Sequence, residues 1–130
     1  MKIQRVLAGL VVACGIVGPV QSDTLLSGPV YGGLGQTHVA CVVVNAGTAP
    51  IHFVTTELLG QYVAPLPLNY NDCRVSLLPG AICSFQAATL DHQATACKVS
   101  IMEAKTNVRG TMMALSPVPT NANLSAADLR

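Results

Sequence analysis

The sequence has few charged residues and no tryptophan. Asp, Glu, Lys and Arg together make up 10% of the 130 residues, and seven Lys and Arg are nearly balanced by six Asp and Glu. The basic residues form no cluster, whereas binding to phosphates needs several Lys or Arg on one face. We therefore expect no nucleic-acid partner. A chain this apolar and this poor in charge is typical of a sandwich of strands whose outer faces carry Thr, Ser, Asn and Gln.

No hydrophobic run is long enough to cross a bilayer. The longest, Val6 to Val20, has about 15 residues against the ~20 that a spanning helix needs, and glycines interrupt it. Lys2 and Arg5 precede this run and small residues up to Ser22 follow it. This is the pattern of a secretory signal peptide over residues 1–22. We expect cleavage after Ser22, a secreted or periplasmic protein, and no membrane span.

A lipoprotein signal is the alternative interpretation of the same segment. The small and apolar residues Val11 to Ala13 precede Cys14, as attachment of a lipid at Cys14 requires. However, the apolar run before Cys14 is very short, and another apolar stretch, Gly15 to Val20, would follow the cut. We therefore favour soluble export over lipidation at Cys14.

The residue types that catalysis needs are present but not grouped. No serine lies in a nucleophile-elbow sequence, and Asp91 and His92 are neighbours on a predicted loop, where successive side chains diverge. Glu57 and Glu103 are the candidates for a carboxylate pair, but we expect each at a strand end as an ordinary exposed charge. We predict no catalytic residue, no cofactor and no enzymatic activity, and rank a hydrolase last.

Closely spaced pairs of metal ligands are also missing. Zinc sites bring their ligands in as such pairs, whereas nine residues separate the nearest two cysteines. A copper site of the cupredoxin kind is the alternative, since that fold is also a secreted sandwich and the chain contains His38, His52, His92, Cys97 and Met102. Cupredoxins place a histidine between the cysteine and the methionine, but this interval contains none. We predict no metal site and keep a small metal- or ligand-binding sandwich as the alternative function.

What the chain does contain is a series of short β-rich runs separated by turn residues. Val39, Cys41 and Val43 alternate so that they share one face of a strand, and the turn Leu78 to Gly80 separates two further alternating runs. No stretch of ten or more residues holds a strong helical period. The pattern predicts one all-β domain, an antiparallel β-sandwich of about seven strands over residues 37–115.

The segments on either side of this domain are predicted to be irregular. Residues 23–36 hold five glycines or prolines and show no sustained period, so we expect a flexible lead-in. Residues 116–130 contain prolines, asparagines and small residues. Ser125 and Asp128 have the spacing of a helix capping box, but too few residues follow Asp128 to nucleate a helix. We predict a disordered tail.

Four cysteines remain after the predicted cleavage, namely Cys41, Cys73, Cys83 and Cys97. An even number of cysteines in a small exported domain indicates two disulfides, and three pairings are then open. Cys73 and Cys83 flank the Leu78 to Gly80 turn almost symmetrically, so a hairpin would bring them together. We prefer the pairs Cys73–Cys83 and Cys41–Cys97, while the other two pairings stay open.

An aromatic and apolar strip is the first choice for a contact surface with another protein. It consists of Tyr62, Leu66, Leu68 and Tyr70. The prolines within this segment remove ladder donors and confine it to a sheet edge or a crossover, which leaves the rings and leucines free to touch a partner. The alternative is a crossover whose apolar side chains cap the core.

Three spacings around the cysteines carry a resemblance. Cys41 and Cys97 are 56 residues apart, Phe53 follows Cys41 by twelve residues, and Asp91 precedes Cys97 by six. The segment 37–115 thus resembles the immunoglobulin-like sandwich, in which a cysteine of the second strand bonds one of the sixth across the two sheets. It looks like a small exported bacterial domain of this type, with Val44-Asn45, Leu78 to Gly80 and Cys97 to Val99 as the matching features. The resemblance implies architecture and export, and the predicted function is an exported, non-enzymatic structural or protein-binding domain.

Overall fold

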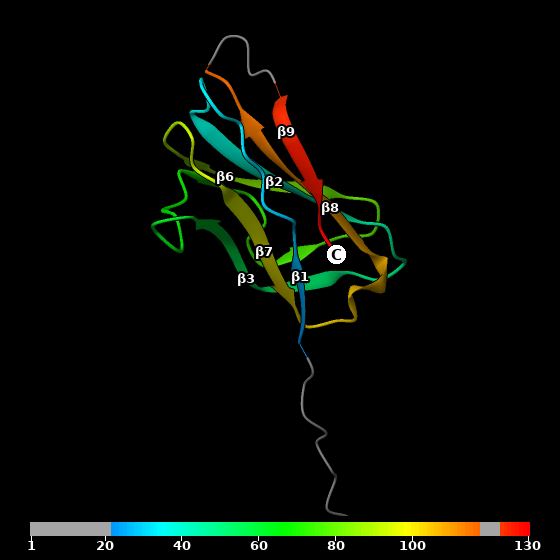
Figure 1. Ribbon diagram of the computed structural model, residues 1–130. Coiled ribbons are helices and arrows are strands. Elements are labelled where there is room, and N and C mark those ends of the chain that lie inside the picture. Colours follow the sequence, from blue (N-terminus) through cyan, green and yellow to red (C-terminus); the bar gives the residue numbers. More distant parts are fainter. Residues whose placement is uncertain (1–21, 118–122) are drawn as a thin grey trace, which may run out of the picture.

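The computed structural model describes residues 22–117 and 123–130 (Figure 1). The predicted signal peptide and the alternative lipid site at Cys14 fall on residues 1–21 almost entirely, outside the described part of the chain. Among the described residues, no helix has the length and apolar character needed to cross a membrane.

The described chain folds into two antiparallel β-sheets. One sheet has the strand order β1-β7-β3-β5 and the other has the order β4-β6-β2-β8-β9. A single short 3-10 helix, η1, precedes β8 within the described residues. The prediction of an all-β fold is confirmed. The elements are β1 (Asp23–Leu26), β2 (His38–Asn45), β3 (Ile51–Gly60), β4 (Tyr70–Asn71), β5 (Ser76–Leu77), β6 (Ile82–Ala88), β7 (Thr95–Ile101), η1 (Lys105–Asn107), β8 (Val108–Leu115) and β9 (Asn123–Asp128).

Alternation along the strands builds one hydrophobic core between the sheets. Val39, Cys41 and Val43 of β2 are fully buried, as their shared face predicts, and they belong to the same core cluster as Phe85 of β6 and Val99 of β7. Successive side chains of a strand point to opposite faces, so every second residue enters this core. Full burial of such a side chain contributes about 1.5–3 kcal/mol relative to exposure.

Both preferred disulfide pairs are present. Cys41 of β2 is bonded to Cys97 of β7, which joins the two sheets through the centre of the core, with 6.0 Å between the Cα atoms. Cys73, which follows β4, is bonded to Cys83 of β6, with 5.2 Å between the Cα atoms. Each bridge lowers the conformational entropy of the unfolded chain and so stabilises the fold by about 2–4 kcal/mol.

The segment predicted as a flexible lead-in is ordered by pairing and burial. Residues Asp23–Leu26 form β1, which pairs with β7 in antiparallel register. Leu25 and Val30 are almost fully buried in the core. The prediction from glycine and proline content was wrong here because two apolar side chains and a free sheet edge on β7 outweigh local flexibility.

The segment predicted as a disordered tail also contains a strand. β9 pairs with β8, and Leu129 beyond it is only 5% exposed. The chain then crosses to the other sheet, where the main-chain groups of Arg130 and Leu26 exchange hydrogen bonds of 3.1 and 3.3 Å. Figure 1 shows this C-terminal end beside β1. The prediction of disorder for residues 123–130 was wrong, because the exposed edge of β8 supplies pairing that local propensity does not reveal.

The strand order differs from the constant-type immunoglobulin arrangement at both flanks of the domain. There, the first strand pairs in the sheet of the second strand and the last strand pairs with the sixth. Here the first strand, β1, pairs with β7, and β8 pairs with β2. β1 and β8 therefore each lie in the sheet opposite to the one that the first and last strands occupy in the constant-type arrangement. The immunoglobulin-like relationship stays a prediction.

Candidate binding site

Three loops meet at one end of the sandwich. They are residues 27–37, 61–69 and 89–94, which follow β1, β3 and β6. Gln36, almost completely buried, joins two of them: its Oε1 accepts from the Gly32 main chain at 2.6 Å, and its Nε2 donates to the Gln93 carbonyl at 2.9 Å. Because the amide is buried and satisfied at both ends, it holds the loops in a fixed relation.

Further contacts tie the first loop to the third. The hydroxyl of Tyr31 lies 2.7 Å from Nδ1 of His92, and the Gly35 main chain donates to Asp91 Oδ1 at 3.0 Å. His92 adopts a positive φ of 58°, and its main-chain N–H donates to the Gly33 carbonyl, with 3.3 Å between nitrogen and oxygen. The predicted neighbours Asp91 and His92 therefore act as structural contacts between the loops.

A cavity of about 410 Å³ opens between the second and third loops. The main chain of the second loop is fixed against β3, since Leu66 N donates to the Leu58 carbonyl at 2.7 Å and Gly60 N donates to the Val63 carbonyl at 3.0 Å. A volume of this size is within the range of small-ligand and side-chain pockets. Its lining contains no acidic or basic residue and consists of Tyr62, Val63, Leu66, Pro67, Ala88, Thr89, Leu90 and Gln93.

Large apolar side chains are exposed around this cavity. Tyr62 is 79% exposed, Leu90 75% and Val63 57%, and all three line the cavity. The first loop does not line it, but it is bonded to the third loop and presents the exposed residues Leu34 and Tyr31. We call these five residues the apolar loop end. Grouped exposed apolar residues with a polar surround mark interaction surfaces in soluble proteins.

The structure separates the four residues of the predicted contact strip. Tyr62 and Leu66 line the cavity, but Leu66 is buried and forms its inner wall. Leu68 is half-buried and packs against the core, as the alternative interpretation of a capping crossover expects. Tyr70 lies on β4, where its hydroxyl donates to Asp72 Oδ2 at 3.0 Å; this hydrogen bond and the charge of Asp72 raise the pKa of the Tyr70 phenol.

Sequence reasoning missed the wall contributed by the third loop. Thr89, Leu90 and Gln93 follow β6 and face the proline-containing segment across the cavity. A leucine in a turn of polar residues, Leu90 before Asp91, was the available signal, because an apolar side chain has no local reason to be there.

The candidate copper ligands are not assembled. Cys97 is bonded to Cys41 in a disulfide. The three histidines contact different groups. His38 contacts the hydroxyl of Thr37 at 2.9 Å, His92 contacts the hydroxyl of Tyr31, and His52 contacts the carboxylate of Glu103 at 2.6 Å. A cupredoxin-like site needs a free thiolate, so the finding on Cys97 removes the basis for that alternative.

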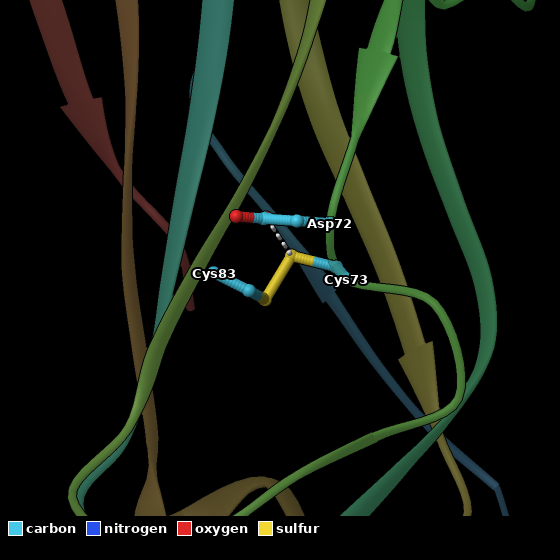
Figure 2. Close-up of side chains that lie close together, drawn as sticks. All are labelled: Asp72, Cys73 and Cys83. Atoms are coloured by element: carbon cyan, nitrogen blue, oxygen red, sulfur yellow. Dashed lines mark hydrogen bonds between the residues drawn. A yellow bond between two sulfur atoms is a disulfide. The ribbon is translucent and has the colours of Figure 1, made fainter.

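One cluster of potential ligand atoms occurs among the described residues, and its sulfur atoms are also bonded to each other. Asp72, Cys73 and Cys83 bring their ligand atoms within 4.8 Å of one another (Figure 2). Figure 2 shows the Cys73–Cys83 bond with the Asp72 carboxylate beside it, 4.0 Å from Cys73 Sγ. Asp72 Oδ1 accepts a hydrogen bond from the Ser84 main chain. The cluster fastens the β4 end to β6.

The two candidate catalytic carboxylates each form an ion pair. Glu57 lies within β3, and its Oε2 is 2.8 Å from Nζ of Lys98 on β7. Glu103 accepts from both the ring and the main chain of His52. Partial burial of Glu103 is the largest single influence and by itself raises the carboxyl pKa, but the hydrogen bonds to the carboxylate and the charge of His52 together lower it by more, so the net pKa lies below its usual value. The pairs belong to different elements and form no joint site.

A second cavity, of about 610 Å³, lies where the C-terminal residues cross from β8 to β1. Its rim mixes cations with the carboxylate of Asp128, and the guanidinium of Arg109 is already occupied by the carbonyls of Thr106 and Val108 at 2.7 and 2.8 Å. The smaller cavity is therefore the stronger candidate, because the exposed apolar side chains surround it.

No family model, no curated protein and no solved structure matches the chain.

Proposed function

We propose that the chain is an exported, non-enzymatic domain that binds another protein through the apolar loop end. The observation that carries the proposal is the exposure of Tyr62, Val63 and Leu90 around a cavity without charged lining. Aromatic and aliphatic side chains of this kind supply the buried centre of protein interfaces.

The loops that present these side chains are fixed before any partner arrives. Gln36 joins the first and third loops from within the protein, and Leu66 anchors the second loop to β3. A surface held in its binding conformation loses less conformational entropy on association, so more of the contact energy appears as affinity.

Export is supported by the two disulfides and by the sequence of residues 1–22. Disulfides persist in a periplasm or outside the cell and are rare in a reducing cytosol. Both bridges are buried, with each of the four cysteines at most 4% exposed. We infer that residues 1–22 are a signal peptide and that the mature sandwich is a variant of the immunoglobulin-like fold, with its flanking strands in exchanged sheets.

The non-enzymatic part of the proposal is supported by the contacts of the polar side chains. His52 is paired with Glu103, His92 with Tyr31, and Glu57 with Lys98. Nucleophile, base and orienting group would have to lie within hydrogen-bond reach of one another, and these pairs contain no serine, threonine or thiol nucleophile.

Site-specific photo-crosslinking in producing cells tests the proposal. A photoreactive residue at position 90 should give one discrete adduct in the exported fraction, whereas the same residue at Leu78, an exposed leucine in the turn beyond β5, should give none. The partner is then purified and titrated with the oxidised protein, and Tyr62→Ser should weaken binding at least tenfold.

Three outcomes would overturn the proposal. The first is the absence of any adduct at position 90, and the second is the same adduct at positions 90 and 78. An adduct whose purified partner binds wild-type and Tyr62→Ser protein equally would also contradict it. Leu34→Ser, a change at an exposed leucine of the first loop, tests whether the surface extends beyond the cavity.

A further inference from the structure

The side chain of Gln93 has an unusual position at the wall of the apolar cavity. It is 6% exposed, and its Oε1 accepts a hydrogen bond from the Thr89 hydroxyl at 2.7 Å. Its Nε2 donates to no group in the part of the chain that the structure describes, and this atom is not among the fully buried atoms without a partner, so it keeps some contact with solvent. An amide donor beside a cavity that the protein leaves without an acceptor is free to bond water or a ligand.

A chain of hydrogen bonds fixes which way this amide faces. Nε2 of Gln36 lies 3.5 Å from the Thr89 hydroxyl oxygen, so that oxygen acts as an acceptor there. The single hydroxyl proton of Thr89 is then left to donate to Oε1 of Gln93. The NH₂ group of Gln93 must therefore point the other way.

Glycine at position 60 makes room for that NH₂ group. A Cβ atom at Gly60 would lie 2.9 Å from Gln93 Nε2 and 2.8 Å from a methyl carbon of Leu66. The unpartnered donor thus sits beside Leu66, which lines the cavity together with Gln93 itself. The cavity combines apolar walls with a few polar groups, among them the Gln93 amide donor, which is the usual composition of a specific recognition pocket.

We propose that this cavity receives one neutral apolar side chain of the partner polypeptide, and that Gln93 Nε2 donates a hydrogen bond to a main-chain carbonyl beside that side chain. The inference rests on the proposed function and names the chemistry of its site. A charged occupant is disfavoured because no lining residue could pair with it. A carbonyl acceptor is favoured because it satisfies the Gln93 amide donor, which no described group of the protein satisfies.

A blocked amino acid probes this chemistry without the natural partner. N-acetyl-leucine N-methylamide, titrated into ¹⁵N-labelled, oxidised protein, should give saturable NMR shifts at the side-chain NH₂ of Gln93 and at the amides of Leu66 and Leu90. The glutamate analogue has the same backbone and a charged side chain, and should bind at least tenfold more weakly. Gln93→Met keeps the side-chain length without the donor and should weaken the leucine probe by about three- to tenfold, the usual net effect of one hydrogen bond.

A comparison of two uncharged probes on the wild-type protein does not depend on any variant's folding. Methyl isobutyl ketone and isohexane share a carbon skeleton, but only the ketone has an acceptor. The ketone should shift the Gln93 NH₂ signals, which the hydrocarbon should leave in place. The inference is overturned when neither the leucine probe nor the ketone shifts these signals, or when the glutamate analogue binds as well as the leucine probe.

The two proposals fail in distinguishable ways. A leucine probe that binds in the cavity while position 90 captures no partner would retain the pocket and remove the proposed function. The proposed function would stand and this inference would fail if two results came together. The captured partner would bind wild-type and Gln93→Met protein equally, and the wild-type protein would not bind the leucine probe.

Discussion

The side-chain amide of Asn45 donates a hydrogen bond to the carbonyl of Leu77 at 2.9 Å, although 32 residues separate the two. The same amide donates to the Ala49 carbonyl at 2.8 Å, and its oxygen accepts from the Gly47 main chain at 2.9 Å. Asn45 ends β2 and Leu77 ends β5, the edge strand of the other sheet. One fully buried side chain therefore links the two sheets and the turn between β2 and β3.

We predict that Asn45→Ala lowers the free energy of unfolding by about 2–4 kcal/mol, because buried main-chain groups lose their partners and the side chain's volume is left empty. Urea unfolding of the oxidised protein measures the change. Asn69→Ala is the matched control: Asn69 is exposed and its main-chain hydrogen bond to Gln86 does not involve the side chain. A loss at Asn45 no greater than that at Asn69 would contradict the linking role.

The two disulfides should stabilise the domain to different extents. The Cys41–Cys97 bridge closes a sequence separation of 56 residues and the Cys73–Cys83 bridge one of 10. In the chain-entropy model this difference in loop length favours the longer loop by ~1.5 kcal/mol. We therefore expect Cys41→Ala/Cys97→Ala to reduce stability more than Cys73→Ala/Cys83→Ala.

Thiol counting tests the bridges themselves. The mature protein, denatured without reductant, should show no reactive thiol, and each paired variant should also show none because both partners are removed. Two or more thiols per mature chain would contradict the disulfide assignment. Equal urea midpoints and slopes for the two paired variants would contradict the predicted order of stabilisation.

The ion pair between Glu103 and His52 predicts a dependence of stability on pH. The pKa of Glu103 is lowered on folding from a reference value of 4.5, since the hydrogen bonds to the carboxylate and the charge of His52 together outweigh the effect of burial. A carboxyl with a lowered pKa stabilises the fold above its unfolded pKa, and this contribution disappears as the pH falls through the folded pKa. Glu103→Gln should therefore reduce stability at neutral pH, by about 0.5 kcal/mol or less for so exposed a pair, and make no difference at strongly acidic pH.

An NMR titration of the Glu103 side chain measures the same property directly. Its midpoint should lie below 4.5. His52→Ala should move the midpoint only part of the way back, because the main-chain hydrogen bond from residue 52 remains. A midpoint at or above 4.5 in the wild-type protein would contradict the predicted direction.

The regular strands were predictable because alternation alone specifies them. Val39, Cys41 and Val43 face the core as their spacing indicates. The predicted Cys73–Cys83 bond is present, but the hairpin expected around Leu78 to Gly80 is not: β5 pairs with β3, and the pairing of β4 with β6 brings the two cysteines together. Asp23–Leu26 and the residues from Asn123 onward were not predictable in this way. Their order comes from pairing with β7 and β8, which is a property of the assembled sheets rather than of the local sequence.

The candidate site was predictable only in part. Tyr62 and Leu66 stood out because prolines surround them, and both line the cavity. Leu90 and Gln93 are more than twenty residues further along the chain, in a loop whose position depends on the buried amide of Gln36. No local pattern identifies a hydrogen bond between residues 36 and 93, so the opposite wall of the cavity required the folded structure.

The ordered C-terminal residues give the last prediction. Leu129 is 5% exposed and packs against Gly110 of β8, where a Cβ atom would lie 3.3 Å from its Cδ2 and 2.6 Å from the Val42 carbonyl oxygen. Leu129 thus occupies space that exists because position 110 is glycine. Leu129→Ala should cost about 2–5 kcal/mol, as for other buried leucines, whereas Leu34→Ala, at a residue 80% exposed, should change stability by less than about 0.5 kcal/mol. Urea unfolding of both variants decides between a docked strand and a tail without contacts, since a free tail would leave the two leucine variants equally stable.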